Sequence, residues 1–373
     1  MAEGGVTARA APDASKLRTT DAPRASASEK RDLDCGMRMQ VDVKDRANHS
    51  SGVDASTSRL RRAFGGPGEL ARGRRGCRAD HVALAVLAAA ASVWLSACSG
   101  GSDSATPTAP TAPAPPGSSS SVVYTPIGAS DAAGVGASVP CLPLATSCRD
   151  STSYVGLVQR RLSDSRPVSL LNLALPGGVL SPDVEALGDE LGRNIPGNLL
   201  AQVAPFVPPG TTLVTIFAGG NDVNTIALAI GAGRGGADPA VWLTQQVQGF
   251  ARDYGRLVDV IRARAPGAFI VILNAPNFGA LPYLNGRPIA ERRIVQDVAV
   301  RLTREAINPL ASRVPVVDLM CDARSYQPGI YSADGFHPND QGYAFLAEVL
   351  LQAITSGSAP APASSCAFMT LVG

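Results

Sequence analysis

The sequence predicts an α/β protein with three layers (α/β/α), built on a flavodoxin-like five-stranded parallel sheet with helices on both faces. Short apolar runs rich in β-branched residues alternate along the chain with longer segments of helical spacing. The runs are apolar almost throughout, as expected of strands that are covered on both faces. In such sheets, ligands bind beyond the carboxyl ends of the strands.

The apolar runs and the helical segments follow one another in the order that a parallel sheet requires. The expected strands are 122–127, 168–175, 212–218, 269–274 and 314–320. The expected helices are 153–162, 199–206, 239–264, 289–313 and 341–355. The helix 239–264 is expected to end at Ala265-Pro266-Gly267, and Pro338 and Asn339 mark the start of the last helix.

Composition divides the chain into four parts. Residues 1–80 are rich in Ala, Arg, Ser, Asp and Gly without apolar periodicity, which indicates a disordered or untranslated N-terminal extension. Residues 81–98 form an apolar run of signal-peptide length that follows a basic patch. Residues 99–121 are rich in Ser, Thr and Pro, as in a solvated tether. Residues 122–373 form the globular domain.

The end of the apolar run, Leu95-Ser96-Ala97-Cys98, resembles a bacterial lipobox, whose cysteine is lipidated and becomes the new N-terminus. We therefore expect export and a lipid anchor at Cys98 that holds the domain at the bacterial cell envelope, in the periplasm or on the outer surface. A start site assigned too far upstream would explain why this signal lies so far from Met1. The alternatives are an uncleaved membrane anchor, for which the run is short against about 20 residues, and a buried helix.

The cysteines support an exported domain. Three of the seven lie in the lipobox or before it, which leaves an even number in the globular part. We expect two disulfides there. Closeness in sequence favours Cys141–Cys148, which leaves Cys321–Cys366 to hold the C-terminal tail. Free buried thiols are the alternative, and no Cys/His spacing indicates a metal site.

The charge balance excludes one class of partner. The formal net charge is +2 and charged residues make up 17% of the chain, so no strong field favours nucleic acid. Hydrophobic residues make up 45% and aromatic residues only 5%, so Ala, Val and Leu must fill most of the core.

His337 is the only histidine downstream of residue 81. Acid–base chemistry through an imidazole near neutral pH therefore depends on this residue. It lies in Asp334-Gly335-Phe336-His337-Pro338, and Ser130 follows the first expected strand. A serine, a histidine and a carboxylate are the parts of an activated nucleophile. Taken alone, Ser130 could instead be the N-cap of a helix. Asp334-x-x-His337, taken alone, could be a solvated turn before a helix.

Further candidate groups follow the other strands. Gly177 comes after the second strand and Gly219-Gly220-Asn221-Asp222 after the third, while His337 comes after the fifth. Glycine lets a backbone N–H approach a substrate closely, and asparagine supplies a neutral donor. Parallel strand ends share one edge of the sheet, so we expect these groups to converge there.

In this order, the motifs resemble those of the SGNH, or GDSL-type, hydrolases. The similar segments are Gly128-Ala129-Ser130-Asp131-Ala132-Ala133-Gly134, Asn172-Leu173-Ala174-Leu175-Pro176-Gly177, Gly219-Gly220-Asn221-Asp222 and Asp334-Gly335-Phe336-His337-Pro338. The resemblance implies a hydrolase domain over 122–373 that cleaves carboxylic esters without metal or organic cofactor.

The resemblance also implies a role for each site residue. Ser130 is the nucleophile, His337 the base and Asp334 the residue that orients it. The backbone N–H groups of Ser130 and Gly177 and the Asn221 amide bind the oxyanion. One departure is Ala129, where the family usually has Asp before the serine. Asp131 is a candidate for part of the lost hydrogen bonding.

We therefore expect a lipid-anchored serine esterase, acting as a monomer on a small-molecule, lipid or acylated-sugar ester. Lipase or arylesterase, thioesterase and sugar deacetylase activities remain open. The alternatives are a non-catalytic envelope lipoprotein that binds glycans or lipids and, less favoured, a flavodoxin-like binding protein. The Gly/Ala-rich segment 223–237 is either a mobile flap or a slack connection. Phe278, Leu281 and Tyr283 either line an acyl pocket or pack in the core.

Overall fold

The computed structural model describes residues 113–117 and 120–373. The expected extension, signal peptide and lipidated Cys98 lie outside these residues, as does most of the expected tether. The predictions made for them therefore remain predictions.

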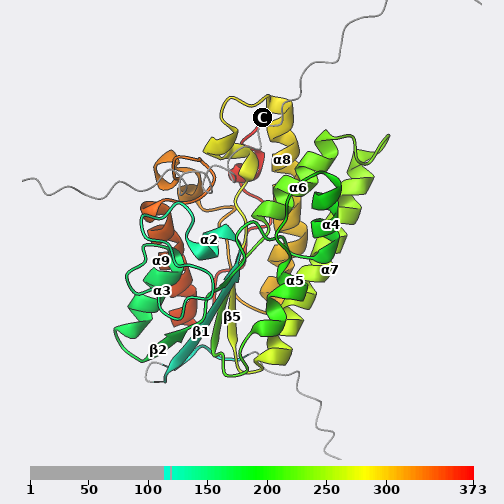
Figure 1. The fold of residues 1–373 in the computed structure, drawn as a ribbon. Coiled ribbons are helices and arrows are strands. Elements are labelled where there is room, and N and C mark those ends of the chain that lie inside the picture. The colour runs from blue at the N-terminus through cyan, green and yellow to red at the C-terminus, as the bar shows by residue number, and fades with distance from the viewer. Residues whose placement is uncertain (1–112, 118–119) are drawn as a thin grey trace, which may run out of the picture. The chain divides into compact units, whose positions relative to one another are not determined.

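A parallel sheet forms the centre of the described domain (Figure 1). Its strands are ordered β2-β1-β4-β5-β6, and the short β3 also pairs with β1. Every pairing is parallel. This is the predicted α/β arrangement. The strands are β1 (Val122–Gly128), β2 (Val168–Leu170), β3 (Leu173–Ala174), β4 (Leu213–Phe217), β5 (Phe269–Leu273) and β6 (Val316–Val317).

The second expected strand, 168–175, is split into β2 and β3. The interruption falls at Asn172, whose backbone bonds to a neighbouring loop: its N–H donates to Ala145 O and its carbonyl accepts from Leu144 N–H. Its side-chain amide donates to Ala132 O at 3.0 Å and to Cys141 O at 2.8 Å. Asn172 therefore joins the edge of the sheet to the segment that follows Ser130. The count of six strands instead of five comes from this one break.

Helices cover both faces of the sheet, as expected for strands that are buried on both sides (Figure 1). One face is covered by α3 (Tyr154–Ser163) and α9 (Asp340–Ser356). The other is covered by α4 (Pro182–Glu190), α5 (Leu199–Gln202), α6 (Gly220–Gly231), α7 (Pro239–Arg264) and α8 (Ile289–Arg301). Alternate β5 residues supply the two cores: Ile270 and Ile272 face the larger helical layer, and Val271 and Leu273 the smaller.

Several predicted elements need correction. The segment 223–237 is not a flap or a slack connection over most of its length, because α6 continues to Gly231. Buried Val223, Ile226 and Ala229 give α6 an apolar face that its glycine and alanine content obscured. Helix α4 also escaped prediction. The expected helix 289–313 changes to a π-helical turn after Arg301 and then to a 3₁₀ turn that contains Pro309, which cannot continue an α-helix.

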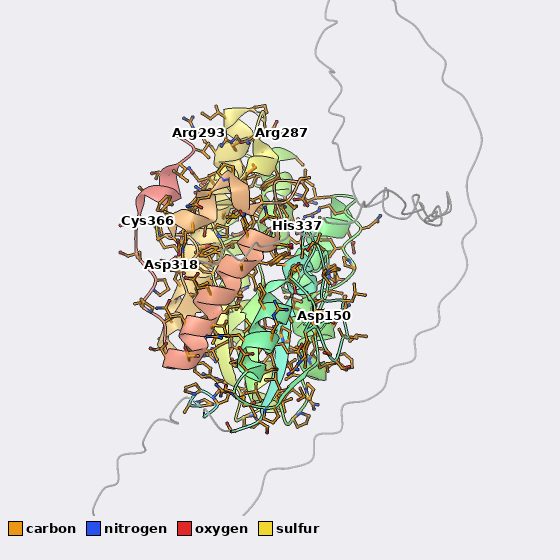
Figure 2. All side chains as sticks on the ribbon, turned by 90° about the vertical axis from the view of Figure 1, so that its left-hand side faces the viewer. Asp150, Arg287, Arg293, Asp318, His337 and Cys366 are labelled. Atoms are coloured by element: carbon orange, nitrogen blue, oxygen red, sulfur yellow. A yellow bond between two sulfur atoms is a disulfide. The ribbon has the colours of Figure 1, made fainter. Side chains whose placement is uncertain are left out.

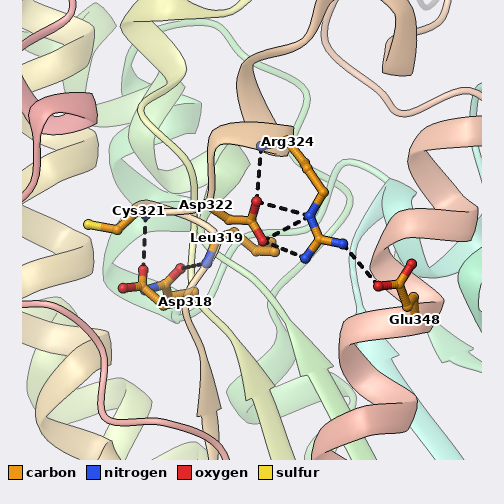
Figure 3. A network of polar contacts seen from close by, with 7 residues as sticks. Asp318, Leu319, Cys321, Asp322, Arg324 and Glu348 are labelled. Carbon is orange, nitrogen blue, oxygen red and sulfur yellow. Dashed lines mark hydrogen bonds and ion pairs between the residues drawn. The ribbon is translucent and has the colours of Figure 1, made fainter.

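Both expected disulfides are present, Cys141–Cys148 and Cys321–Cys366. A polar network lies beside the second one (Figure 3). Asp318 accepts the Cys321 N–H at 3.2 Å and, from the tail, the Ala363 N–H at 2.9 Å. Arg324 pairs with Asp322 at 2.7 Å and with Glu348 of α9 at 3.0 Å. The segment after β6, which leads to His337, is thereby held against the tail and α9.

Loss of the two disulfides is expected to affect stability unequally. Cys321–Cys366 closes a loop with a sequence separation of 45 and Cys141–Cys148 one of 7. On the chain-entropy account, replacing both cysteines of a pair by serine costs about 4 kcal/mol for the first and about 2 kcal/mol for the second. Denaturant unfolding of the two double variants measures the difference. A larger loss from the Cys141–Cys148 pair would contradict this order.

Candidate active site

Ser130 begins α2 (Ser130–Ala133), a single helical turn that follows β1 at the carboxyl edge of the sheet. Its side chain is largely buried, with 7% of the residue exposed. The Ser130 Oγ lies 2.8 Å from Nε2 of His337, although the two residues are 207 positions apart in the chain. The fold therefore brings the sequence-predicted serine and histidine into hydrogen-bond contact.

His337 lies just before α9, on a loop that returns to the same edge (Figure 2). Its Nδ1 lies 2.6 Å from Oδ2 of Asp334. Oδ1 of Asp334 accepts the backbone N–H groups of Phe336 at 2.8 Å and His337 at 2.9 Å. Gly335 has φ +69°, and a Cβ there would lie 2.6 Å from the Tyr283 backbone nitrogen. Only glycine therefore suits this turn.

The hydrogen bonds of this loop determine the ionisation of Asp334 and His337. Burial alone would raise the pKa of Asp334, but bonds from the His337 ring and the two backbone N–H groups outweigh it and hold the pKa well below its usual range. Burial alone would lower the pKa of His337, but the bond to Asp334 and the negative charges of Asp131 and Asp334 leave it raised. The arrangement favours an ionised Asp334 that stabilises an imidazolium.

The expected oxyanion donors come from the strands that flank β1. β3 precedes Gly177, β1 precedes Ser130 and β4 precedes Asn221; Gly128 of β1 pairs with Ala174 of β3 and with Phe217 of β4. Within the described residues, the backbone N–H groups of Ser130 and Gly177 donate to no other protein group. Both remain available to a substrate oxygen.

Asn221 is fixed by the neighbouring loop. Its Nδ2 donates one hydrogen to Gly178 O at 2.9 Å, and an amide nitrogen carries a second hydrogen. The adjacent Asp222 is buried and accepts the Leu180 N–H at 2.9 Å. These two bonds tie the start of α6 to the loop that holds Gly177. The three expected donors therefore belong to one connected structure.

Burial raises the pKa of Asp222 to about 7, against the lowering effects of its backbone hydrogen bonds and of Arg193. Arg193, which follows α4, donates to the Asn221 carbonyl at 3.2 Å and also to Thr225 Oγ1, both in α6. Sequence reasoning missed Arg193 because it stands outside every motif. The motif Gly219-Gly220-Asn221-Asp222 marks Asp222 in the sequence, but the sequence does not show that its carboxylate accepts the Leu180 N–H.

Aromatic rings surround the histidine. The Phe336 ring stacks on Phe278 with centroids 5.4 Å apart and meets the edges of Tyr283 at 5.0 Å and His337 at 4.9 Å. Phe278 and Leu281 are buried members of the core, and Tyr283 donates its hydroxyl to Asn224 Oδ1 at 2.9 Å. All three therefore pack in or against the core, and of the three only Phe278 also lines the hollow that Ser130 lines.

Ala129 is buried and Asp131 half-buried. Among the described residues, no other residue donates a hydrogen bond to the Asp131 carboxylate. The hypothesis that Asp131 replaces the loop-to-loop hydrogen bonds of the family's aspartate is therefore wrong. Loop contacts come instead from Asn172, which bonds to Ala132 O, and from Leu175 N–H, which bonds to Gly128 O.

In the described part of the chain, no cluster of three or more His, Cys, Asp or Glu side chains is placed to hold a metal ion. None of its helices combines the length and the apolar character needed to cross a membrane.

A serine bonded to a histidine that is bonded to an aspartate, with backbone and amide donors at the same sheet edge, is the arrangement of a serine hydrolase. Residues 127–345, more than half of the chain, match the model of the GDSL-like lipase/acylhydrolase family, and the chain belongs to this family. No curated protein matches it.

Several solved structures are similar to the chain. The lipase Lip_vut3 from a goat rumen metagenome is 19% identical, with 62% of this chain and 97% of that chain covered and a TM-score of 0.42. An extracellular lipase from Streptomyces rimosus is 21% identical, with 62% and 99% covered and a TM-score of 0.43. An acetyl xylan esterase from Geobacillus stearothermophilus is 17% identical, with 62% and 94% covered and a TM-score of 0.37.

Proposed function

We propose that the protein is a serine esterase that cleaves carboxylic esters through an acyl-enzyme on Ser130. The contact of 2.8 Å between Ser130 Oγ and His337 Nε2 carries the proposal. His337 takes the serine proton as Oγ attacks the ester carbonyl, and Asp334 stabilises the imidazolium. His337 then gives the proton to the departing alcohol.

The negative oxygen of the tetrahedral intermediate is bound by the Ser130 and Gly177 N–H groups and by the free hydrogen of the Asn221 amide. After the alcohol leaves, water enters in its place. His337 takes a proton from the water, which attacks the acyl carbon, and then returns a proton to Oγ. The carboxylic acid leaves and the serine is restored.

Short-chain chromogenic esters test this function directly. The proposal requires hydrolysis that a serine-reactive organophosphate abolishes, with the phosphoryl group found on Ser130 by mass spectrometry. A folded protein that binds glycans or lipids but hydrolyses none of a panel of p-nitrophenyl esters, a thioester and acetylated xylan would favour the non-catalytic alternative. The same panel separates lipase, thioesterase and deacetylase activities.

Export and lipid anchoring belong to the same proposal. They rest on the segment Leu95-Ser96-Ala97-Cys98 after a basic and apolar stretch. N-terminal analysis of the protein from bacterial envelopes tests them, with a diacylglyceryl group expected on Cys98. Recovery of an unmodified Cys98, or of a mature form that begins elsewhere, would refute the anchor but not the esterase.

The pH dependence of the reaction follows from the His337 pKa. Only the neutral imidazole accepts the serine proton, so kcat/KM rises with pH through the free-enzyme pKa of His337. Because that pKa is raised above its ordinary value of 6.5, the acid limb is expected above pH 6.5. Asp131→Asn removes one of the charges that raise it and is expected to move the limb to lower pH. A pH–rate profile of both proteins checks this, and an unmoved limb would contradict it.

A further inference from the structure

Arg193 is a half-buried arginine that bonds to the first turn of α6, where Asn221 lies. Its Nη1 donates to the Asn221 carbonyl at 3.2 Å and also to Thr225 Oγ1. The Thr225 hydroxyl donates in turn to the same carbonyl at 2.7 Å. Thr225 is fully buried, so water does not compete for its hydroxyl. The guanidinium, the hydroxyl and the carbonyl therefore form one closed group of hydrogen bonds.

The first turn of α6 needs support from outside the helix. Its N-cap is Gly219, which has φ +119° and no side chain that could cap the helix. Gly220 follows, and glycine leaves the backbone more freedom than any other residue. The first N–H groups of a helix also have no partners within the helix. The position of Asn221 therefore depends on contacts with neighbouring segments.

Polar contacts hold this turn from two directions. From the loop after β3, the Gly178 carbonyl accepts the Asn221 side-chain amide at 2.9 Å, and the Leu180 N–H donates to Asp222 at 2.9 Å. From the segment after α4, Arg193 bonds to the backbone of Asn221. The amide can aim its second hydrogen only if both the side chain and the backbone of Asn221 are fixed. Arg193 supplies the bond to the backbone.

Arg193 is itself fixed by the end of α4. Gly192 turns the chain with φ +71°, and the Arg193 N–H donates to the Gly188 carbonyl at 2.9 Å. Helix α4 packs beside α6 (Figure 1). The guanidinium therefore reaches α6 from a backbone that is already held in place.

The bonding of the guanidinium suits a positioning role. In the part of the chain that the structure describes, no carboxylate pairs with Arg193, and its bonds go to neutral oxygens. Burial lowers the pKa of Arg193, against the opposing effect of the Asp222 charge. A half-buried charge without an ion-pair partner is costly. In return, a charged donor forms stronger hydrogen bonds than a neutral one, which favours a fixed geometry at Asn221.

We propose that Arg193 is a positioning residue that aims the Asn221 amide at the oxyanion. It acts through the Asn221 carbonyl and the Thr225 hydroxyl. This inference rests on the proposed acyl-enzyme at Ser130 and adds a residue on which the stabilisation of its tetrahedral intermediate depends.

Arg193→Met tests the proposal, because it removes the charge and the donors but keeps a long unbranched side chain. It is expected to lower kcat for p-nitrophenyl butyrate about 10-fold with little change in KM, since Asn221 bonds to the oxygen only after it becomes negative. Arg193→Lys keeps a charged donor and is expected to recover part of the loss. Steady-state kinetics of the full-length proteins measure both effects.

Arg234→Met is the matched control. Arg234 is exposed, follows α6 and pairs with Glu190, the last residue of α4. It therefore joins the same two helices as Arg193, but at the opposite end of α6 from Asn221. Its replacement is expected to leave kcat unchanged.

A double-mutant cycle separates positioning from general support of the fold. The Asn221→Ala protein has no amide to aim, so adding Arg193→Met to it is expected to change kcat by less than about 2-fold. A loss as large as that in the unmodified background would overturn the proposal. An unchanged kcat in Arg193→Met, or equal rates for the Met and Lys variants, would overturn it as well.

Nuclear magnetic resonance of isotope-labelled protein gives a second measurement that does not depend on activity. The Asn221 side-chain amide, assigned by its absence from the Asn221→Ala spectrum, is expected to exchange with solvent faster in Arg193→Met than in the unmodified and Arg234→Met proteins. Unchanged exchange would contradict the positioning role. A failure of the unmodified protein to hydrolyse any ester would count against the esterase, and the exchange rates would still decide whether Arg193 holds Asn221.

Discussion

Ser130→Ala is expected to abolish ester hydrolysis, with kcat lowered by a factor of roughly 10⁶. Without Oγ no acyl-enzyme forms, and His337 has no proton to take from the position 2.8 Å away. The loss exceeds that from any single oxyanion donor, because the covalent route itself disappears. Steady-state rates on p-nitrophenyl butyrate measure the effect, and intact-mass analysis after quenching shows whether an acyl adduct forms.

Ser165→Ala is the matched control for this result. Ser165 is exposed and follows α3 shortly before β2, at the opposite end of the strands from Ser130. Its replacement is expected to leave kcat unchanged. Among the residues that the structure describes, Ser130 Oγ bonds only to His337, so its removal is also expected to leave the unfolding transition close to that of the unmodified protein. A folded Ser130→Ala protein that retains the original rate would end the case for an acyl-enzyme at this residue.

The sheet was predictable because its signal is local. Each long strand is a run of apolar residues buried on both faces, and β4 and β5 are buried over their whole length. The elements that escaped prediction depend on contacts that sequence does not display. β2 and β3 are separate because Asn172 bonds to Ala145 and Cys141, and α6 is helical although four of its residues are glycine or asparagine.

The site residues that belong to short motifs could be predicted from the sequence. Short motifs named the serine, histidine, aspartate and asparagine, and the order of the parallel strands placed them at one edge. Arg193, by contrast, lies beyond α4 and outside every motif. It reaches the Asn221 carbonyl only in the folded chain, so no pattern in the sequence marks it.

The proposed oxyanion donors differ in how firmly they are held. The Ser130 and Gly177 groups are backbone N–H groups, fixed by α2 and by a turn in which Gly177 has φ +79°. Asn221 uses a side chain, whose orientation depends on the bond of 2.9 Å to the Gly178 carbonyl. That bond fixes one amide hydrogen and so aims the other. Preorganisation of this kind is what makes a donor effective in the transition state.

Asn221→Ala is accordingly expected to lower kcat by roughly 100–1,000-fold with little change in KM, because the amide bonds to the oxygen only after it becomes negative. Asn224→Ala is the matched control: Asn224 lies one turn further along α6 and accepts the Tyr283 hydroxyl at 2.9 Å. Its loss is expected to change kcat by less than about 10-fold. Equal effects of the two replacements, or a loss confined to KM, would show that Asn221 shapes the site without binding the oxyanion.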